Sequence, residues 1–295
     1  MNKPEAIINE IINGQWLLSH QGLMEFRHLM ESLKNGQPQA YEENRKDNML
    51  SFYNEDFQRI NARDVSEIPE GAIAVIHCIG LLMKYGSWYT WGADEIVYQL
   101  DYANTMRNVA AIILVIDGPG GSVAALPPFM EFAKRKRKPI VGWCDTSLSL
   151  HRAIPDVVCD YQIAQNDFCA KFGSVGVVSS WQDLTQYYEN LGIKMQEVYA
   201  DESSHKSEIW RKLQEDEAAG KQLMKDRDLS PMAVKFQNIV KAAHPNLIEE
   251  EGVLTGRVFG ADDAIRLNMI NGKGSLQDAM KIAKGLAEVQ QTSSF

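Results

Sequence analysis

Three glycines in one turn are spaced so that backbone N–H groups there could stabilise a negative charge during catalysis. Gly118, Gly120 and Gly121 follow an apolar run at residues 109–116 and precede a segment with helical spacing. Glycine permits positive φ angles and close backbone approach, and adjacent N–H groups at a helix start can point at one developing negative charge. Acyl transfer and enolate chemistry both need such an oxyanion hole, formed here by the N–H groups of Gly120 and Gly121. A plain strand-to-helix turn would use the same glycines, and no phosphate-loop motif follows them.

Strands and helices that alternate on both sides of this turn must position it. Short apolar runs rich in β-branched residues predict strands at 72–78, 109–116, 139–143, 161–164, 175–178 and 194–199. Apolar residues at helical spacing predict helices at 94–106, 124–134, 181–191 and 276–286, with a charged helical stretch from 209 to 243. The alternation predicts an α/β fold with right-handed crossovers.

Three parts are expected along the chain. Residues 1–70 show helical spacing at 7–16 and 23–33 and carry no evident chemistry, so we predict a helical N-terminal extension that serves docking or assembly. Residues 71–288 are predicted to form the main domain, and residues 289–295 a flexible tail. A chain of 295 residues is long enough for one large domain or two modest ones.

The composition narrows the classes of function. With 30 Lys and Arg against 39 Asp and Glu, the formal net charge is −9, which argues against sequence-independent binding to nucleic acid. The four cysteines form no CxxC pair, which fits a reducing compartment. We expect neither a signal peptide nor a membrane-spanning segment. The sequence therefore predicts a cytoplasmic protein without a membrane anchor, a metal or a cofactor.

The order of several motifs is more informative than any one of them. Residues 117–122 are Asp-Gly-Pro-Gly-Gly-Ser, followed by Lys-Pro-Ile-Val at 138–141, Gly-Ser-Val-Gly-Val at 173–177 and Gly-Arg-Val-Phe at 256–259. This order resembles the signal peptide peptidase A (SppA)-type serine peptidases over roughly residues 71–285, and looks closest to phage and prophage members. The resemblance implies a ClpP/crotonase-like spiral of ββα units, and a bacterial or phage-infected cell as the setting.

The same resemblance implies a Ser–Lys dyad, in which a lysine with a lowered pKa deprotonates the serine. Counting forward from Asp145 and back from Asp160 places the family's nucleophile position at Leu150, which has no nucleophilic atom. Two interpretations remain open. A slip of one residue makes Ser149 the nucleophile, with Ser147 a weaker candidate, or the site is inactive and the fold is a scaffold.

Three further residues depart from the family pattern. His151 and Arg152 stand where the family has small residues, and Pro155 stands where the family has an apolar helix. A proline costs about 3 kcal/mol in a helix interior. Residues at i and i+2 do not face each other on a helix, so we interpret His151 as a packing residue rather than as a base for Ser149. We interpret His77, in a predicted strand, as a core residue.

The candidate general base is Lys206, in the segment Ser-Ser-His-Lys-Ser at 203–207, with Lys212 a weaker candidate. A loop lysine with no catalytic role is the plainer interpretation of either residue. In family members with a single repeat the lysine comes from a neighbouring subunit. The resemblance therefore implies a homo-oligomeric ring.

Three functions follow in order of preference. The first is a serine endopeptidase that hydrolyses protein or peptide substrates through an acyl-enzyme, with phage head maturation as a candidate process. The alternative is a catalytically inactive scaffold or assembly module of the same fold. A crotonase-type acyl-CoA enzyme ranks third, because no acidic catalytic pair is evident in the sequence.

Overall fold

The structure is a computed structural model, and it describes residues 10, 16–20, 22–24, 26–27, 49–61, 64–86, 91–179, 185–194 and 196–292. The helices predicted at 7–16 and 23–33 lie largely outside the described residues, as does the first part of the helix predicted at 181–191. Contacts divide the chain into two units. The first comprises Met1–Gly176 with Phe236–Phe295, and the second is Val177–Lys235.

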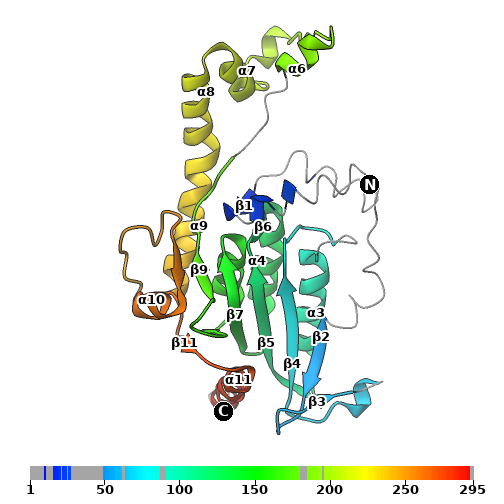
Figure 1. Cartoon of the computed structure of the whole chain (residues 1–295). Coiled ribbons are helices and arrows are strands. Elements are labelled where there is room, and N and C mark those ends of the chain that lie inside the picture. Colours follow the sequence, from blue (N-terminus) through cyan, green and yellow to red (C-terminus); the bar gives the residue numbers. More distant parts are fainter. Residues whose placement is uncertain are drawn as a thin grey trace. The chain divides into compact units, whose positions relative to one another are not determined.

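Parallel strands form the centre of the first unit. β4 (Ala72–Ile79), β5 (Val109–Gly118) and β7 (Ile140–Leu148) lie side by side in the order β4-β5-β7 (Figure 1). Most of their residues are buried, as expected for parallel strands covered on both faces. Three helices make the crossovers, namely α3 (Ala93–Thr105), α4 (Leu126–Arg135) and α5 (Leu150–Val158). The predicted α/β fold is confirmed.

A repeating unit connects these strands. After β5 the chain forms a short second strand, β6 (Gly120–Ser122), before it enters α4. After β4 it makes isolated bridges at Leu82 and Met83 before it enters α3. Each of these two units is thus a strand, a short extended segment and a helix, in agreement with the ββα units that were expected. β7 differs, because one residue, Ser149, leads it directly into α5.

Shorter strands complete the sheets. The main sheet has the order β10-β9-β7-β5-β4-β2-β3, with β8 joined to β7 and β11 to β8. The added strands are β2 (Leu50–Tyr53), β3 (Arg59–Ile60), β8 (Tyr161–Ala164), β9 (Lys171–Gly173), β10 (Val258–Gly260) and β11 (Gly272–Lys273). β1 (Trp16–Leu18) lies outside this sheet and pairs with β6.

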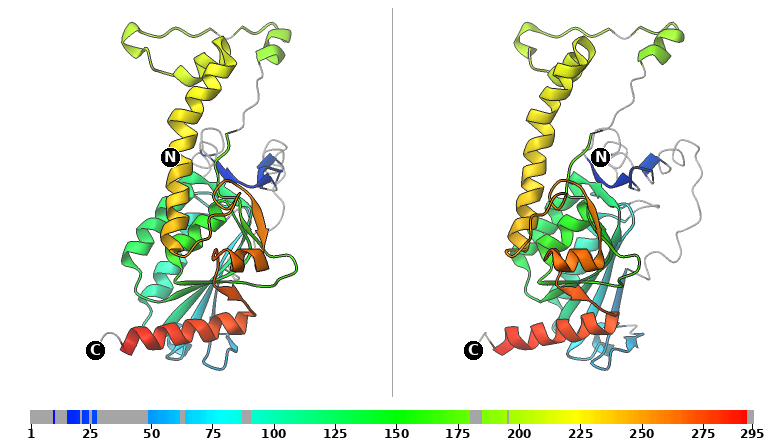
Figure 2. Two further views of the ribbon diagram at one scale, coloured as in Figure 1. Left: turned by 90° about the vertical axis from the view of Figure 1, so that its left-hand side faces the viewer. Right: turned by 60° about the vertical axis from the view of Figure 1, so that its left-hand side comes forward.

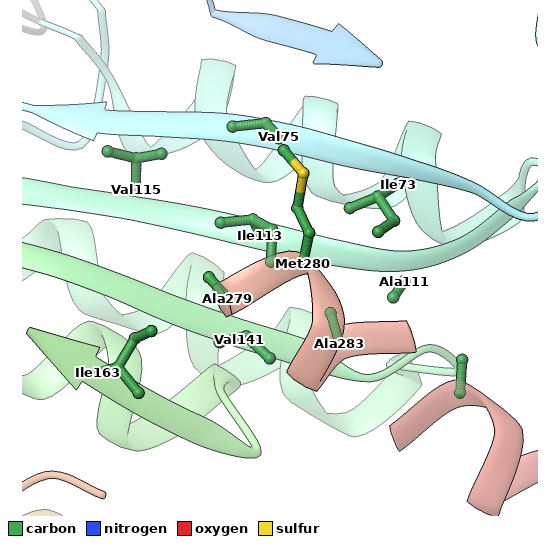
Figure 3. Packing of buried hydrophobic residues seen from close by; sticks show 11 residues of the cluster. Ile73, Val75, Ala111, Ile113, Val115, Val141, Ile163, Ala279, Met280 and Ala283 are labelled. Carbon is green, nitrogen blue, oxygen red and sulfur yellow. The ribbon is translucent and has the colours of Figure 1, made fainter. Parts of the chain in front are cut away.

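One face of the sheet is covered by the helix α11 (Leu276–Thr292), which lies across the strands (red in Figure 2). Ala279, Met280 and Ala283 of α11 pack on alternate residues of β4 and β5, among them Ile73 and Val75 (Figure 3). The residues between them point to the opposite face, because side chains alternate along a strand. The apolar side chains around Met280 therefore cover and stabilise one face of the sheet.

The sheet begins before the boundary that was expected at residue 71. β2 pairs antiparallel with β4, so residues within the predicted helical extension add strands to the main domain. At the other end α11 continues to Thr292, past the start of the predicted tail. The strand predicted at 175–178 lies earlier, at β9, because Gly173 and Ser174 have φ angles of 117° and 55° that end an extended run.

The second unit is helical among its described residues. It contains α6 (Thr185–Asn190), α7 (Glu208–Glu215), α8 (Glu217–Met224) and the π-helix Lys225–Leu229. It also includes the first residues of α9 (Ser230–Ala243), up to Lys235. This agrees with the helical stretch predicted from 209 to 243. Residues 194 and 196–199, predicted as a strand, are not in one. Val198 is 98% exposed, so no neighbouring layer covers that segment.

α10 (Ala261–Arg266) lies between β10 and β11. Single turns of 3-10 helix occur at Val65–Glu67, Val123–Ala125 and Asp201–Ser203. Among the described residues, no helix has both the length and the apolar character that crossing a membrane requires.

Candidate active site

Ser149 occupies the sharp turn between β7 and α5. Its φ of 56° and ψ of −115° are unusual for a residue other than glycine, and such a conformation costs about 1–3 kcal/mol. The Ser149 N–H donates to the carbonyl of Gly173 at 2.9 Å, and the Ser149 carbonyl accepts from Arg152 and Ala153. The hydroxyl is buried and has no hydrogen-bond partner among the described residues. Some hydrolases hold their nucleophilic serine on a strained strand-to-helix turn of this kind, but here the hydroxyl is covered.

The start of α5 packs directly on the glycine turn. A methyl group added to Gly121 would lie 2.9 Å from Leu150 Cδ2, and one added to Gly118 would lie 2.3 Å from His151 Nε2. Leu150 is fully buried. The structure therefore places Ser149 immediately beside residues that touch the predicted oxyanion hole.

Both predicted oxyanion donors have neighbours: Gly121 lies opposite Leu17 in the β1–β6 pair, and Gly120 is engaged by a side chain. The Gly120 N–H donates to His151 Nδ1 at 3.2 Å. Burial lowers the pKa of His151 to about 3, so its imidazole is neutral at pH 7. An Nδ1 that accepts a hydrogen bond carries no proton, so the proton is on Nε2. Nε2 itself has no hydrogen-bond partner in the described structure.

Pro155 lies inside α5, and Ser147 explains how the helix tolerates it. A proline has no N–H to donate to the carbonyl four residues earlier, which here belongs to His151. Ser147 Oγ donates to that carbonyl at 3.0 Å. The helix predicted to be disfavoured by Pro155 thus forms across Leu150–Val158. Because the Ser147 hydroxyl is used in this bond, Ser147 is weaker still as a nucleophile.

A buried ionic cluster anchors the same helix. Arg152 and Asp156 are fully buried on successive turns of α5, and Arg152 Nε donates to Asp156 Oδ2 at 3.1 Å. Gln162 Nε2 donates to Asp156 Oδ1 at 2.9 Å, and His244 Nε2 lies 2.9 Å from the same oxygen. The charge of Arg152 is therefore neutralised by Asp156 where it lies. The cluster ties α5 to β8 and to the residue that follows α9.

The candidate lysines lie in the second unit. Lys206 is exposed, its N–H donates to the Ser203 carbonyl at 2.9 Å, and its own carbonyl accepts from Arg211 Nε at 3.2 Å. Lys212 Nζ lies 3.5 Å from a carboxylate oxygen of Glu215. Ser149 and Lys206 belong to different units, so their pairing stays a prediction.

The described residues include no cluster of metal-ligating side chains, and three of the four cysteines have thiols with raised pKa values. No group of three or more His, Cys, Asp or Glu side chains in that part of the chain could hold a metal ion. Burial raises the pKa of the Cys144 thiol to about 12, and it raises the pKa of the Cys78 and Cys159 thiols as well. Thiols in this state are poor nucleophiles.

Sequence reasoning missed the contact between Gly118 and His151. Gly118 has no side chain, and the imidazole of His151 fills the space beside it. The two residues lie 33 positions apart in the sequence, so no local pattern indicates the contact.

Known proteins resemble this chain only distantly. No family model matches it. A protein of Methanocaldococcus jannaschii, named as a "putative protease", is 23% identical over 195 residues, which cover 64% of this chain and 60% of that protein. The chain thus spans about three fifths of the length of this curated relative. The match relates the chain to a protease, at an identity too low to assign a family.

Three solved structures are similar at low identity. A mutant of the 1510-N membrane-bound stomatin-specific protease is 11% identical, with a TM-score of 0.46 over 70% of this chain and 82% of that one. ThnE from S. clavuligerus is 11% identical, with a TM-score of 0.40 over 75% and 85%. An enoyl-CoA hydratase/isomerase from Mycobacterium abscessus, described as probable, is 13% identical, with a TM-score of 0.38 over 76% and 72%. These likenesses are too loose to carry a functional assignment.

Proposed function

We propose that this chain is a serine peptidase of the SppA type, in which Ser149 attacks the carbonyl of a peptide bond. The observation that carries the proposal is the strained backbone of Ser149, at a strand-to-helix turn beside the glycine turn. Strain of this kind persists where the surrounding structure imposes it, and it concentrates at active sites. The distant match to a protease supports the same class of reaction.

The chemistry would proceed through an acyl-enzyme. Lys206 takes the proton of Ser149 Oγ as the oxygen bonds to the carbonyl carbon, and the carbonyl π electrons move to its oxygen. The N–H of Gly121 and the N–H of Leu150 at the start of α5 stabilise that oxyanion. Collapse expels the amine, which takes up the proton, and water then hydrolyses the ester. Lys206 would come from a neighbouring subunit of a homo-oligomeric ring.

A second candidate is the inactive scaffold. It is favoured by the hydrogen bond from the Gly120 N–H to His151 Nδ1, which occupies a donor that an active site would use. Leu150, at the position where the family has its nucleophile, favours it as well. This candidate predicts a folded oligomer that hydrolyses nothing.

Labelling by a fluorophosphonate probe separates the two candidates. The peptidase predicts that mass mapping finds the probe on Ser149, and that casein is cleaved. Ser149→Ala and Lys206→Ala should abolish both, while Lys221→Ala, a control at an exposed lysine of α8, should retain them. If Ser149 stays unlabelled and casein stays intact, the peptidase proposal fails and the scaffold replaces it.

A further inference from the structure

A strand from the N-terminal region is already paired with the glycine turn. β1 (Trp16–Leu18) runs antiparallel to β6, with Leu17 opposite Gly121 and Leu18 opposite Gly120. The two strands form a sheet of their own, separate from the main sheet. In Figure 1 they lie side by side near the carboxyl ends of β5 and β7. The Ser19 N–H extends the contact by donating to the Pro119 carbonyl at 2.9 Å.

The glycines of the turn make room for this strand. A methyl group on Gly120 would lie 2.1 Å from the Leu17 carbonyl oxygen and 3.0 Å from Leu18 Cα. Gly120 also has a φ of 121°, which favours glycine. A glycine in a strand often marks a place where another backbone approaches closely. The outer edge of β6 is therefore shaped to receive an extended backbone.

The side chains of β1 show what the edge accepts. Leu17 is 2% exposed and Leu18 is 8% exposed. Leu18 packs in a cluster with Leu81 and Met83, against which Trp16 is partly buried. Addition of a strand to a sheet edge takes its affinity from main-chain hydrogen bonds and its specificity from the side-chain pockets. The pockets here select apolar residues.

The edge lies beside the candidate nucleophile. Gly121, which pairs with Leu17, also faces Leu150, the residue that follows Ser149. A peptide on this edge would thus run past the start of α5. We infer that Trp16–Leu18 is a resident occupant of the outer edge of β6, and that it must leave before an extended apolar peptide can bind there. The consequence for catalysis rests on the proposed function of Ser149.

A peptide-binding experiment tests the inference. Leu18→Asp places a carboxylate in the apolar cluster and should release β1, whereas Met24→Asp, at a side chain that is 51% exposed, is the matched control. The probe is a fluorescein-labelled peptide, Gln-Trp-Leu-Leu-Ser, followed by fluorescence anisotropy. If β1 occupies the edge in about nine of ten molecules, Leu18→Asp should bind the probe about tenfold more tightly than the wild type. The same probe with Asp in place of its second Leu should not bind.

A second variant guards against misfolding. Ser19→Pro removes the N–H that bonds to Pro119 and keeps both leucines, and it should also tighten probe binding. The inference is overturned if wild type and variants, all folded by circular dichroism, bind the probe equally or not at all. Fluorophosphonate labelling is measured in parallel. Tighter probe binding without any labelling of Ser149 would support the peptide edge and reject the proposed peptidase, so the two failures are distinguishable.

Discussion

Ser147 and Pro155 both determine the hydrogen bonding of the His151 carbonyl, and this predicts how the two positions respond to substitution. The carbonyl of His151 accepts from Ser147 Oγ at 3.0 Å because residue 155 has no N–H to give it. Both Ser147 and His151 are fully buried, so water cannot replace the lost donor. Ser147→Ala should therefore destabilise the protein by about 1–3 kcal/mol, the cost of a buried carbonyl left without a partner.

Pro155→Ala restores an N–H four residues after His151. Alanine is about 3 kcal/mol more favourable than proline in a helix interior, and we expect part of that gain here, since Pro155 is buried and its packing is lost. In this background the His151 carbonyl keeps a donor when Ser147 is removed. The cost of Ser147→Ala should fall, which gives an interaction energy of about 1 kcal/mol or more between the two positions.

Urea unfolding of the wild type, the two single variants and the double variant measures this energy. The control is Pro127→Ala, in the first turn of α4, where a proline leaves no carbonyl without its donor. Ser147→Ala and Pro127→Ala should add. If Ser147→Ala and Pro155→Ala also add to within about 0.5 kcal/mol, the shared-carbonyl explanation is refuted.

Four further outcomes are expected. Acid should destabilise the protein, because burial lowers the pKa of His151 to about 3 from its ordinary 6.5. Between these two pH values the unfolded chain binds more protons than the folded protein. The free energy of unfolding should therefore fall as the pH drops through this range, by up to about 5 kcal/mol. Urea unfolding midpoints measured across this pH range should fall less in His151→Asn than in the wild type. In the control, His205→Gln, they should fall as much as in the wild type. Equal losses in the wild type and both variants would contradict this explanation. Gly118→Ala puts a methyl 2.3 Å from His151 Nε2 and should cost about 1–3 kcal/mol, a loss that His151→Ala should relieve in thermal unfolding. His151→Ala should also free the Gly120 N–H and speed fluorophosphonate labelling of Ser149, by up to about 10²-fold, whereas no change in rate would mean that Gly120 is not an oxyanion donor. Met280→Ala should lose about 2–5 kcal/mol by opening a cavity, against about 0.5 kcal/mol or less for exposed Lys281→Ala; similar losses for both would argue against the core described around α11.

The central strands could be predicted because their sequences carry the signal themselves. Residues 109–116 are apolar throughout, as a parallel strand buried on both faces requires. β2 was missed because its sequence, Leu-Ser-Phe-Tyr, is short and mixed in polarity. Its conformation depends on pairing with β4, whose partner residues lie twenty or more positions later in the sequence. Tertiary pairing of this kind is not visible in a local pattern.

Some features of the candidate site could likewise be predicted from the sequence, and others could not. The spacing between Asp145 and Asp160 predicts a nucleophile at or beside Leu150 and so indicates Ser149, but no local rule gives Ser149 its φ of 56°. The tolerance of Pro155 depends on a hydroxyl eight positions earlier. The bond between Gly120 and His151 joins residues 31 positions apart. Each of these features arises from packing between elements rather than from the pattern within one.

The contact between Gly118 and His151 also constrains the order in which this site can change during evolution. A side chain at position 118 would meet the imidazole of His151, with its Cβ 2.3 Å from Nε2. A smaller residue at 151 removes that conflict, so we expect this change to come before any enlargement at 118. The reverse order would pass through a destabilised protein. Changes at this pair of positions are therefore ordered, and the first step is at position 151.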